Sequence, residues 1–417
     1  MAVLALLVLG WAVVSDLLGR MNINGPLFFL VAGFLLGNPD WGPLPVDVDT
    51  PSVHLLAEVT LALLLFADAA RVNVSKLRHD AFLPARLLGI GLPLSILLGS
   101  FAAAWIFGDL SWALAGFVGA TLAPTDAALS AQVINDRRVP MRLRRLLNVE
   151  SGLNDGIVTP IVAFALAVAA SELGITGHGD SASDPSGGGA LLELALGVLV
   201  GLTIGLGSAI LVSVGSRRHW IVSGGRQLAA LAAALSSFAL AVALDGNGFI
   251  AAFVAGIAFG ARLDEKVADV ERTDELPELV GEVLALAVWF LFGAVLVPFA
   301  FDWVDVSILV YALLSLTVLR CVPVAVALIG SGLDKETVLF VGWFGPRGLA
   351  SVVFALLAVE ELGTQGDVAP AVATVAFTIL LSVLLHGLSA GPLAVLYART
   401  EQDHDKPGDA PLARRSR

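Results

Sequence analysis

The sequence predicts an all-α membrane protein that crosses the bilayer many times. Of its 417 residues, 57% are hydrophobic and 14% are charged, whereas a soluble domain carries about 25% charged residues. Most apolar residues are gathered in runs of about 16 to 27, lengths at which an α-helix crosses a hydrocarbon core. Two of these runs also contain a proline beside a charged side chain, a pattern typical of transporters.

Thirteen hydrophobic segments are predicted as helices joined by brief connections. Their approximate ranges are 1–19, 26–38, 52–70, 82–107, 111–133, 146–170, 190–214, 226–244, 248–262, 279–300, 306–329, 337–359 and 369–397. The first is interpreted as a retained helix, because it lacks the basic region and the cleavage site of a signal peptide. The Gly/Ser/Asp-rich stretch 171–189 is predicted to be a solvated loop, and the polar end beyond about residue 400 is predicted to be disordered.

The distribution of basic residues supports thirteen crossings. With that number, 22 of the 24 Lys and Arg residues fall on one side of the membrane, and the loops of the other side carry only acidic charges. Cytoplasmic loops are enriched in Lys and Arg. We therefore expect a multi-pass protein of the inner membrane with its amino terminus outside and a short tail, 399–417, in the cytoplasm.

The two remaining basic residues, Arg320 and Arg347, lie inside predicted helices. An arginine at membrane depth costs at least about 2.5 kcal/mol, so it normally has a partner and a function. Arg347 follows Gly345-Pro346 in the twelfth segment, and the fifth segment contains Ala123-Pro124-Thr125-Asp126. Proline removes a backbone donor and clashes with the preceding turn, so both helices are predicted to be interrupted.

The two interruptions occupy corresponding positions in the chain. If the seventh segment is a linker, the others form two six-helix halves of opposite orientation, and each interruption lies in the fifth helix of its half. Paired interruptions in inverted repeats indicate the midplane binding site of a transporter. The alternative is an ordinary pair of proline kinks, which membrane helices tolerate, but kinks do not account for the charges beside them.

A second polar cluster opens the sixth segment, in the string Glu150-Ser151-Gly152-Leu153-Asn154-Asp155. Residues four apart stack on one face of a helix, which pairs Glu150 with Asn154 and Ser151 with Asp155. Glu150 and Ser151 could instead be helix-capping residues. Capping does not account for Asp155, which precedes a long apolar stretch and is therefore predicted to lie within the membrane.

These strings resemble the monovalent cation/proton antiporters of the NhaP type, prokaryotic relatives of the eukaryotic sodium/proton exchangers. The matching motifs are Thr125-Asp126, Glu150-Ser151-Gly152-Leu153-Asn154-Asp155, Thr317-Val318-Leu319-Arg320, Gly345-Pro346-Arg347-Gly348 and Leu65-Phe66-Ala67-Asp68-Ala69-Ala70-Arg71. The similarity covers essentially residues 1–398. It implies a homodimer with crossed, unwound helices 5 and 12, scaffold helices at about 1–70 and 190–300, and a mobile core at about 82–170 and 306–397.

The resemblance also implies residue roles. Asp155 is the carboxylate that binds the cation and the proton, and Asn154 is the polar residue before it. Thr125, Asp126 and Ser151 are Na⁺ ligands or their near neighbours, and Glu150 pairs with Arg320. Because Asn154 stands where the electrogenic branch has aspartate, exchange is expected to be electroneutral. Three roles stay open for Arg347: balancing Asp126, lining the cytoplasmic funnel, or compensating exposed carbonyls.

The predicted function is exchange of a monovalent cation for H⁺ within the lipid bilayer, with Na⁺ expected and Li⁺ or K⁺ as alternatives. A carboxylate that holds either a proton or a cation couples the two fluxes. The rival interpretations are an electrogenic or K⁺-selective antiporter, a cation channel and an intramembrane hydrolase, and the sequence has no His-Glu-x-x-His motif of a metal-dependent hydrolase. We expect no enzyme activity, no cofactor and no nucleic-acid partner. His386, in the thirteenth segment, is interpreted as a packing residue rather than a titrating one.

Overall fold

The computed structural model describes residues 2–21, 23–44, 51–71, 82–175, 188–263, 273 and 275–404. These residues form helices and no β-strand, which confirms the predicted all-α class. Nine helical stretches among them are long and apolar enough to cross a membrane, and three further apolar helices are shorter. Thirteen crossings remain a prediction. The predicted loop 171–189 falls largely outside the described residues.

The helices follow the predicted segments closely along the first half of the chain. They are α1 (Ala2–Arg20), α2 (Gly25–Gly37), α3 (Pro51–Arg71), α5 (Phe82–Arg86) running through the π-helical turn η1 (Leu87–Gly91) into α6 (Leu92–Phe107), α7 (Trp112–Thr121), α8 (Ala131–Ile134) and α9 (Met141–Glu172). Each predicted segment in this half therefore contains helical residues.

The second half continues in the same way. Its helices are α10 (Gly188–Arg217), α11 (Ser223–Ala243), α12 (Gly248–Arg262), α14 (Glu275–Leu291), the π-helical turn η3 (Phe292–Leu296), α15 (Val297–Trp303), α16 (Val306–Leu316), α17 (Val318–Ala327), α18 (Lys335–Trp343), α19 (Leu349–Leu362) and α20 (Val368–His404). The last helix runs seven residues past its predicted end at 397, because residues 398–404 include no proline or glycine.

Several helices begin at a side chain that caps the first turn. A side-chain oxygen of the residue before the helix accepts a hydrogen bond from the backbone N–H three positions later at Asn24, Ser111, Asn247, Asp305 and Asp334. Such caps satisfy backbone donors that have no partner within the helix. The sequence therefore fixes these helix starts locally, without help from tertiary contacts.

The two predicted interruptions are present. The fifth segment divides into α7 and α8 with non-helical backbone around Pro124, and the twelfth divides into α18 and α19 around Pro346. A third interruption, at Thr317 between α16 and α17, was not predicted (φ −118°, ψ −87°). Each interruption frees backbone carbonyls at membrane depth, and these groups must find partners within the protein.

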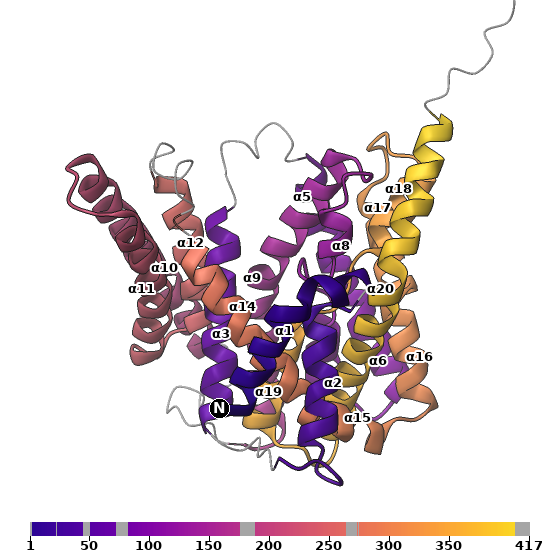
Figure 1. Cartoon of the computed structure of the whole chain (residues 1–417). Helices are drawn as coiled ribbons and strands as arrows, with labels where there is room; N and C mark the ends of the chain where they lie inside the picture. Colours follow the sequence, from indigo (N-terminus) through magenta and orange to yellow (C-terminus); the bar gives the residue numbers. More distant parts are fainter. Residues whose placement is uncertain are drawn as a thin grey trace, which may run out of the picture.

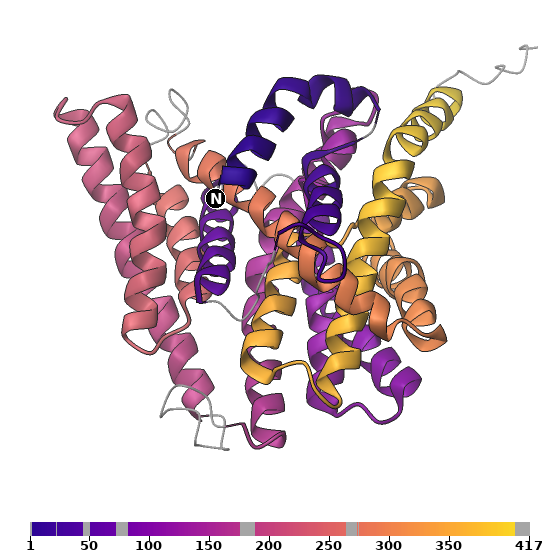
Figure 2. The same ribbon diagram turned by 60° about the horizontal axis from the view of Figure 1, so that its bottom comes forward.

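The helices pack in two groups that meet along α9 and α19. Helices α3, α10, α11 and α12 form a panel, seen at the left of Figures 1 and 2, with α14 against α3. Helices α6, α7, α16, α17, α18 and α20 pack with one another on the other side. Because α9 contacts α7 on one side and α3 and α12 on the other, its polar residues lie close to the boundary between the groups.

Candidate cation site at the crossing of two broken helices

The two interrupted helices are joined through Asp126. Its backbone N–H donates to the carbonyl of Pro346 over 2.9 Å. Its carboxylate accepts from the backbone N–H of Leu349 (2.9 Å), at the start of α19, and from that of Leu129 (3.0 Å). An anion is stabilised at a helix N-terminus, where backbone donors lack partners. Asp126 therefore holds the two interruptions together.

The glycines of the second interruption leave room for this crossing. A Cβ atom placed at Gly348 would overlap the carboxylate of Asp126, and one at Gly345 would lie 2.6 Å from Nε of Arg320. Each of these two contacts would be far shorter than an ordinary van der Waals contact. The motif Gly345-Pro346-Arg347-Gly348 thus combines a proline that interrupts the helix with glycines that admit the neighbouring charged side chains.

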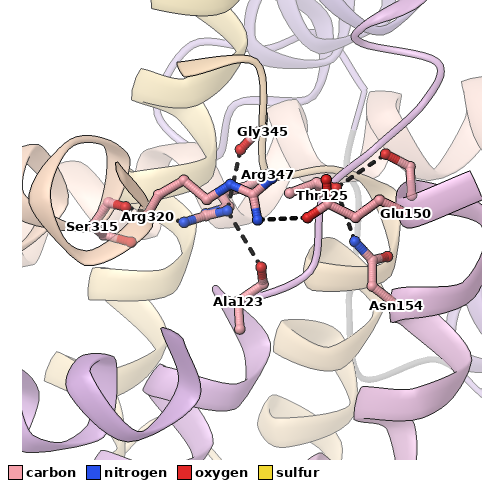
Figure 3. A network of polar contacts seen from close by, with 9 residues as sticks. Ala123, Thr125, Glu150, Asn154, Ser315, Arg320, Gly345 and Arg347 are labelled. Carbon is pink, nitrogen blue, oxygen red and sulfur yellow. Dashed lines mark hydrogen bonds and ion pairs between the residues drawn. The ribbon is translucent and has the colours of Figure 1, made fainter. Parts of the chain in front are cut away.

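Three buried polar side chains meet beside the first interruption. The hydroxyl oxygens of Thr125 and Ser151 are 3.0 Å apart. Nδ2 of Asn154 donates to Oγ1 of Thr125 over 2.8 Å, as Figure 3 shows. Among the described residues, Oδ1 of Asn154 is buried without a hydrogen-bond donor. A buried oxygen without a donor is costly, and hydroxyl and amide oxygens suit a hard cation. The cluster therefore offers free lone pairs.

Asp155 follows this cluster on α9 and is only partly buried. Asp126 and Asp68 interact with it electrostatically. Asp68 belongs to α3 of the panel, and a Cβ atom placed at Gly152 would lie 3.7 Å from the Cβ of Asp68. Asp155 thus adjoins the cluster through Asn154, lies near α3, and is partly exposed.

Glu150 and Arg320 lie together, as the sequence analysis expected. An oxygen of Glu150 is 2.7 Å from Nη1 of Arg320, and both side chains are almost completely buried, with exposures of 3% and 2%. The other Glu150 oxygen and two further Arg320 nitrogens are buried without a hydrogen-bond partner among the described residues. The pair joins α9 to α17 through a single contact.

Removing one partner of this pair is expected to destabilise the protein. The Arg320→Ala variant leaves the carboxylate of Glu150 buried and unpaired, at a cost of about 3–5 kcal/mol. Thermal unfolding in detergent measures the loss. The double variant Glu150→Leu/Arg320→Met should recover most of it, because no charge is then left buried alone.

The exposed pair of Arg20 and Asp16 on α1, 2.6 Å apart, provides the control. Arg20→Ala should cost less than about 1 kcal/mol, since water solvates both charges. An Arg320→Ala protein that unfolds like the wild type would contradict the assignment of this pair as a structural element.

Arg347 lies at the centre of the interruptions with its side chain buried. Its guanidinium donates to the carbonyls of Gly345 (3.1 Å) and Ser315 (3.0 Å) and approaches that of Ala123 (3.4 Å), as Figure 3 shows. The three carbonyls belong to the second, third and first interruptions in that order. Of the three roles left open for Arg347, this geometry matches compensation of exposed carbonyls.

Sequence reasoning did not find every residue near the site. It missed Ser315 and the interruption at Thr317, which no proline or glycine marks. It also missed that Phe253 of α12 lies against Gly156, directly after Asp155. Ser382 and His386 of α20 contact the second interruption, and their only sequence signal was a pair of polar residues four apart in an apolar segment.

The chain matches a known family and has similar relatives. Residues 3–396 match the family described as sodium/hydrogen exchanger, transmembrane. The K⁺/H⁺ antiporter NhaP of Alkalimonas amylolytica is 27% identical, over 79% of this chain and 55% of the relative. The Na⁺/H⁺ antiporter NhaP of Pseudomonas aeruginosa is 28% identical, over 80% of this chain and 78% of the relative.

A second K⁺/H⁺ antiporter, NhaP2 of Shewanella baltica, is 25% identical over 92% of this chain and 64% of the relative. The chain thus spans 55% and 64% of the length of these two K⁺/H⁺ relatives, less than two thirds in each case. The solved structure of the sodium proton antiporter MjNhaP1 from Methanocaldococcus jannaschii superposes with a TM-score of 0.70, covering 95% of this chain and 98% of that one at 19% identity, which shows a shared fold. With the family match extending over nearly its whole length, the chain belongs to the sodium/hydrogen exchanger family.

Proposed function

We propose that this chain exchanges a monovalent cation for protons by alternating access, with Asp155 as the carboxylate that both ions share. The observation that carries the proposal is the buried cluster of Thr125, Ser151 and Asn154 beside partly exposed Asp155, where two interrupted helices cross. The unpaired oxygen of Asn154 is the kind of atom that a cation would satisfy.

The charges at the crossing support a one-for-one exchange. Glu150 and Asp126 carry two negative charges and Arg320 and Arg347 two positive ones, so that Asp155 remains as the unbalanced carboxylate of the core helices. An unbalanced charge at membrane depth is costly. One proton or one monovalent cation neutralises it, and a single site that holds either ion makes the exchange electroneutral.

The ligands of the cation follow from the same geometry. The carboxylate of Asp155, the hydroxyls of Thr125 and Ser151 and the Asn154 amide oxygen would bind it. Asp126 would not bind the cation directly, because its carboxylate oxygens already accept hydrogen bonds from backbone N–H groups. Its negative charge would still favour a cation over an empty site.

The two helix groups suggest which parts move. We assign α3, α10, α11, α12 and α14 to the scaffold, and the interrupted helices with α6, α9 and α20 to a core that shifts against it. The C-terminal ends of α20 and α12 lie at the top of Figure 1, at the same end of the molecule as α5 and α18. We assign this end to the cytoplasm because basic residues gather there. A homodimer formed through the scaffold accords with the family.

Relatives named for Na⁺ and for K⁺ both match this chain. We propose Na⁺, and a K⁺ preference is the second candidate, since several of the similar relatives carry the K⁺ name.

Reconstitution of the purified protein into proteoliposomes with an internal pH dye tests the proposal. An imposed Na⁺ gradient is expected to drive proton movement of the opposite direction, and a voltage clamp set by K⁺ and valinomycin should leave the rate unchanged because no net charge moves. Li⁺ and K⁺ gradients, the latter without valinomycin, establish selectivity. Sodium uptake that moves no protons would identify a channel and refute the exchanger.

A further inference from the structure

His386 of α20 is buried and lies against the second interruption. Its Nε2 is 2.9 Å from the carbonyl oxygen of Trp343, the last residue of α18. Its Nδ1 is 2.9 Å from the carbonyl oxygen of Ser382 and 3.2 Å from the hydroxyl of the same residue. The side chain is 2% exposed, so the ring nitrogens interact with these protein groups and not with bulk water.

The partners of the ring determine which nitrogen carries a proton. A carbonyl oxygen can only accept, so the tautomer with its proton on Nε2 donates to Trp343, and its Nδ1 accepts from the hydroxyl of Ser382. The other neutral tautomer would donate from Nδ1 to the Ser382 carbonyl and would make no hydrogen bond to Trp343. We assign the proton to Nε2, because the Trp343 carbonyl at the end of α18 then has a second donor beside the backbone N–H of Gly345 (2.8 Å).

Ser382 contacts the other edge of the same interruption. Its hydroxyl oxygen accepts a hydrogen bond from the backbone N–H of Arg347 over 2.7 Å. Two residues one turn apart on α20 therefore hydrogen-bond to the unwound stretch on both sides, His386 at Trp343 and Ser382 at Arg347. The Trp343 ring is fixed to the same helix, because its Nε1 donates to Ser389 over 3.0 Å and its ring lies 5.2 Å from that of His386.

The second interruption is in turn hydrogen-bonded to the first. The carbonyl of Pro346, which lies between Trp343 and Arg347, accepts from the backbone N–H of Asp126, and the backbone N–H of Leu349 donates to the carboxylate of Asp126. Thr125 precedes Asp126 and carries the hydroxyl that meets Ser151 and Asn154. Hydrogen bonds thus connect α20 to the oxygen cluster through the two interruptions, whose backbone is largely non-helical.

We infer that Ser382 and His386 are positioning residues for the cation site, acting through the second interruption on Asp126 and Thr125. The inference rests on the proposed exchange function and extends it to a helix that contributes no cation ligand. Without the hydrogen bonds from Ser382 and His386, the unwound segment has several backbone conformations. Only one of them presents Pro346 and Leu349 to Asp126. The cation, which needs several oxygens at fixed distances, is more sensitive to this loss than the proton, which needs one.

Substitutions of His386 in the proteoliposome assay test the inference. His386→Leu removes the donor to Trp343 and is expected to raise the half-saturating Na⁺ concentration about tenfold, the size of one buried hydrogen bond, with a much smaller change in the maximal rate. His386→Gln keeps an amide donor at similar reach and should restore much of the affinity. Ser382→Ala should act in the same direction as His386→Leu.

The matched control is Thr378→Val. Thr378 is buried on the same helix one turn earlier, but its hydroxyl bonds to the Thr374 carbonyl of its own helix, so the half-saturating concentration should not change. A folded His386→Leu protein with the wild-type half-saturating concentration would overturn the inference, as would equal losses in the Leu and Gln variants. Should His386→Leu fail to fold, Ser382→Ala decides by the same criterion. Wild-type protein in the same preparation separates the two proposals, because its failure to exchange would refute the function itself.

Discussion

The Asp155→Asn variant is expected to fold and to lose cation-driven proton movement, by at least about 100-fold, the lower range for loss of a proton-transferring group. Asparagine keeps the size and one oxygen of the side chain but can neither be protonated nor carry the negative charge. The two arginines then balance Glu150 and Asp126 without any ion. Binding of a cation would add an unbalanced positive charge at membrane depth, which is unfavourable.

The measurement is the rate of dye-reported proton movement after a Na⁺ jump, with folding checked by thermal unfolding. Asp109→Asn is the matched control, because Asp109 lies exposed between α6 and α7 and the same chemical change there should leave the rate intact. If a folded Asp155→Asn protein still exchanged ions, the shared carboxylate would have to be another residue, and Asp126 would be the next candidate.

The parts of this site that the sequence predicted are those set by local rules. Proline disfavours the interior of a helix, and beside charged residues at 124 and 346 it predicts both interruptions. The prolines at 160, 323 and 392 remain inside helices. The spacing of Ser151 and Asp155 on a continuous helix likewise dictates that they share a face. The pairing of Glu150 with Arg320 followed from the resemblance, and the two side chains indeed lie together.

The remaining parts depend on contacts between segments far apart in the chain. Arg347 donates to carbonyls near residues 123 and 315, and no local rule indicates which freed carbonyls an arginine will reach. The interruption at Thr317 carries no proline or glycine, so no local helix breaker indicates it. His386 was interpreted as a packing residue, because the sequence does not indicate that α18 ends at Trp343 and presents its carbonyl to this histidine.

The Gly156→Ala variant is expected to lose most of its exchange activity through a clash between the two helix groups. Gly156 lies on α9 directly after Asp155, and a Cβ atom placed there would overlap the ring of Phe253 on α12. Phe253 is itself 9% exposed and packed in the core, so the ring has little room to withdraw. Overpacking of this kind costs about 1–3 kcal/mol, which corresponds to about a 5- to 150-fold loss of the packed conformation.

The double variant Gly156→Ala/Phe253→Ala separates this clash from a general effect of alanine on α9, because removing the ring makes room for the new methyl group. It should regain much of the activity that the single variant loses. Gly116→Ala on α7 is the control, since nothing lies within 4 Å of a Cβ atom there, and its exchange rate should match the wild type. If the double variant stayed as slow as Gly156→Ala, the contact between α9 and α12 would not limit transport. Recovery would instead support the interpretation that exchange requires a close fit between α9 and α12 at the residue after the proposed ion-binding carboxylate.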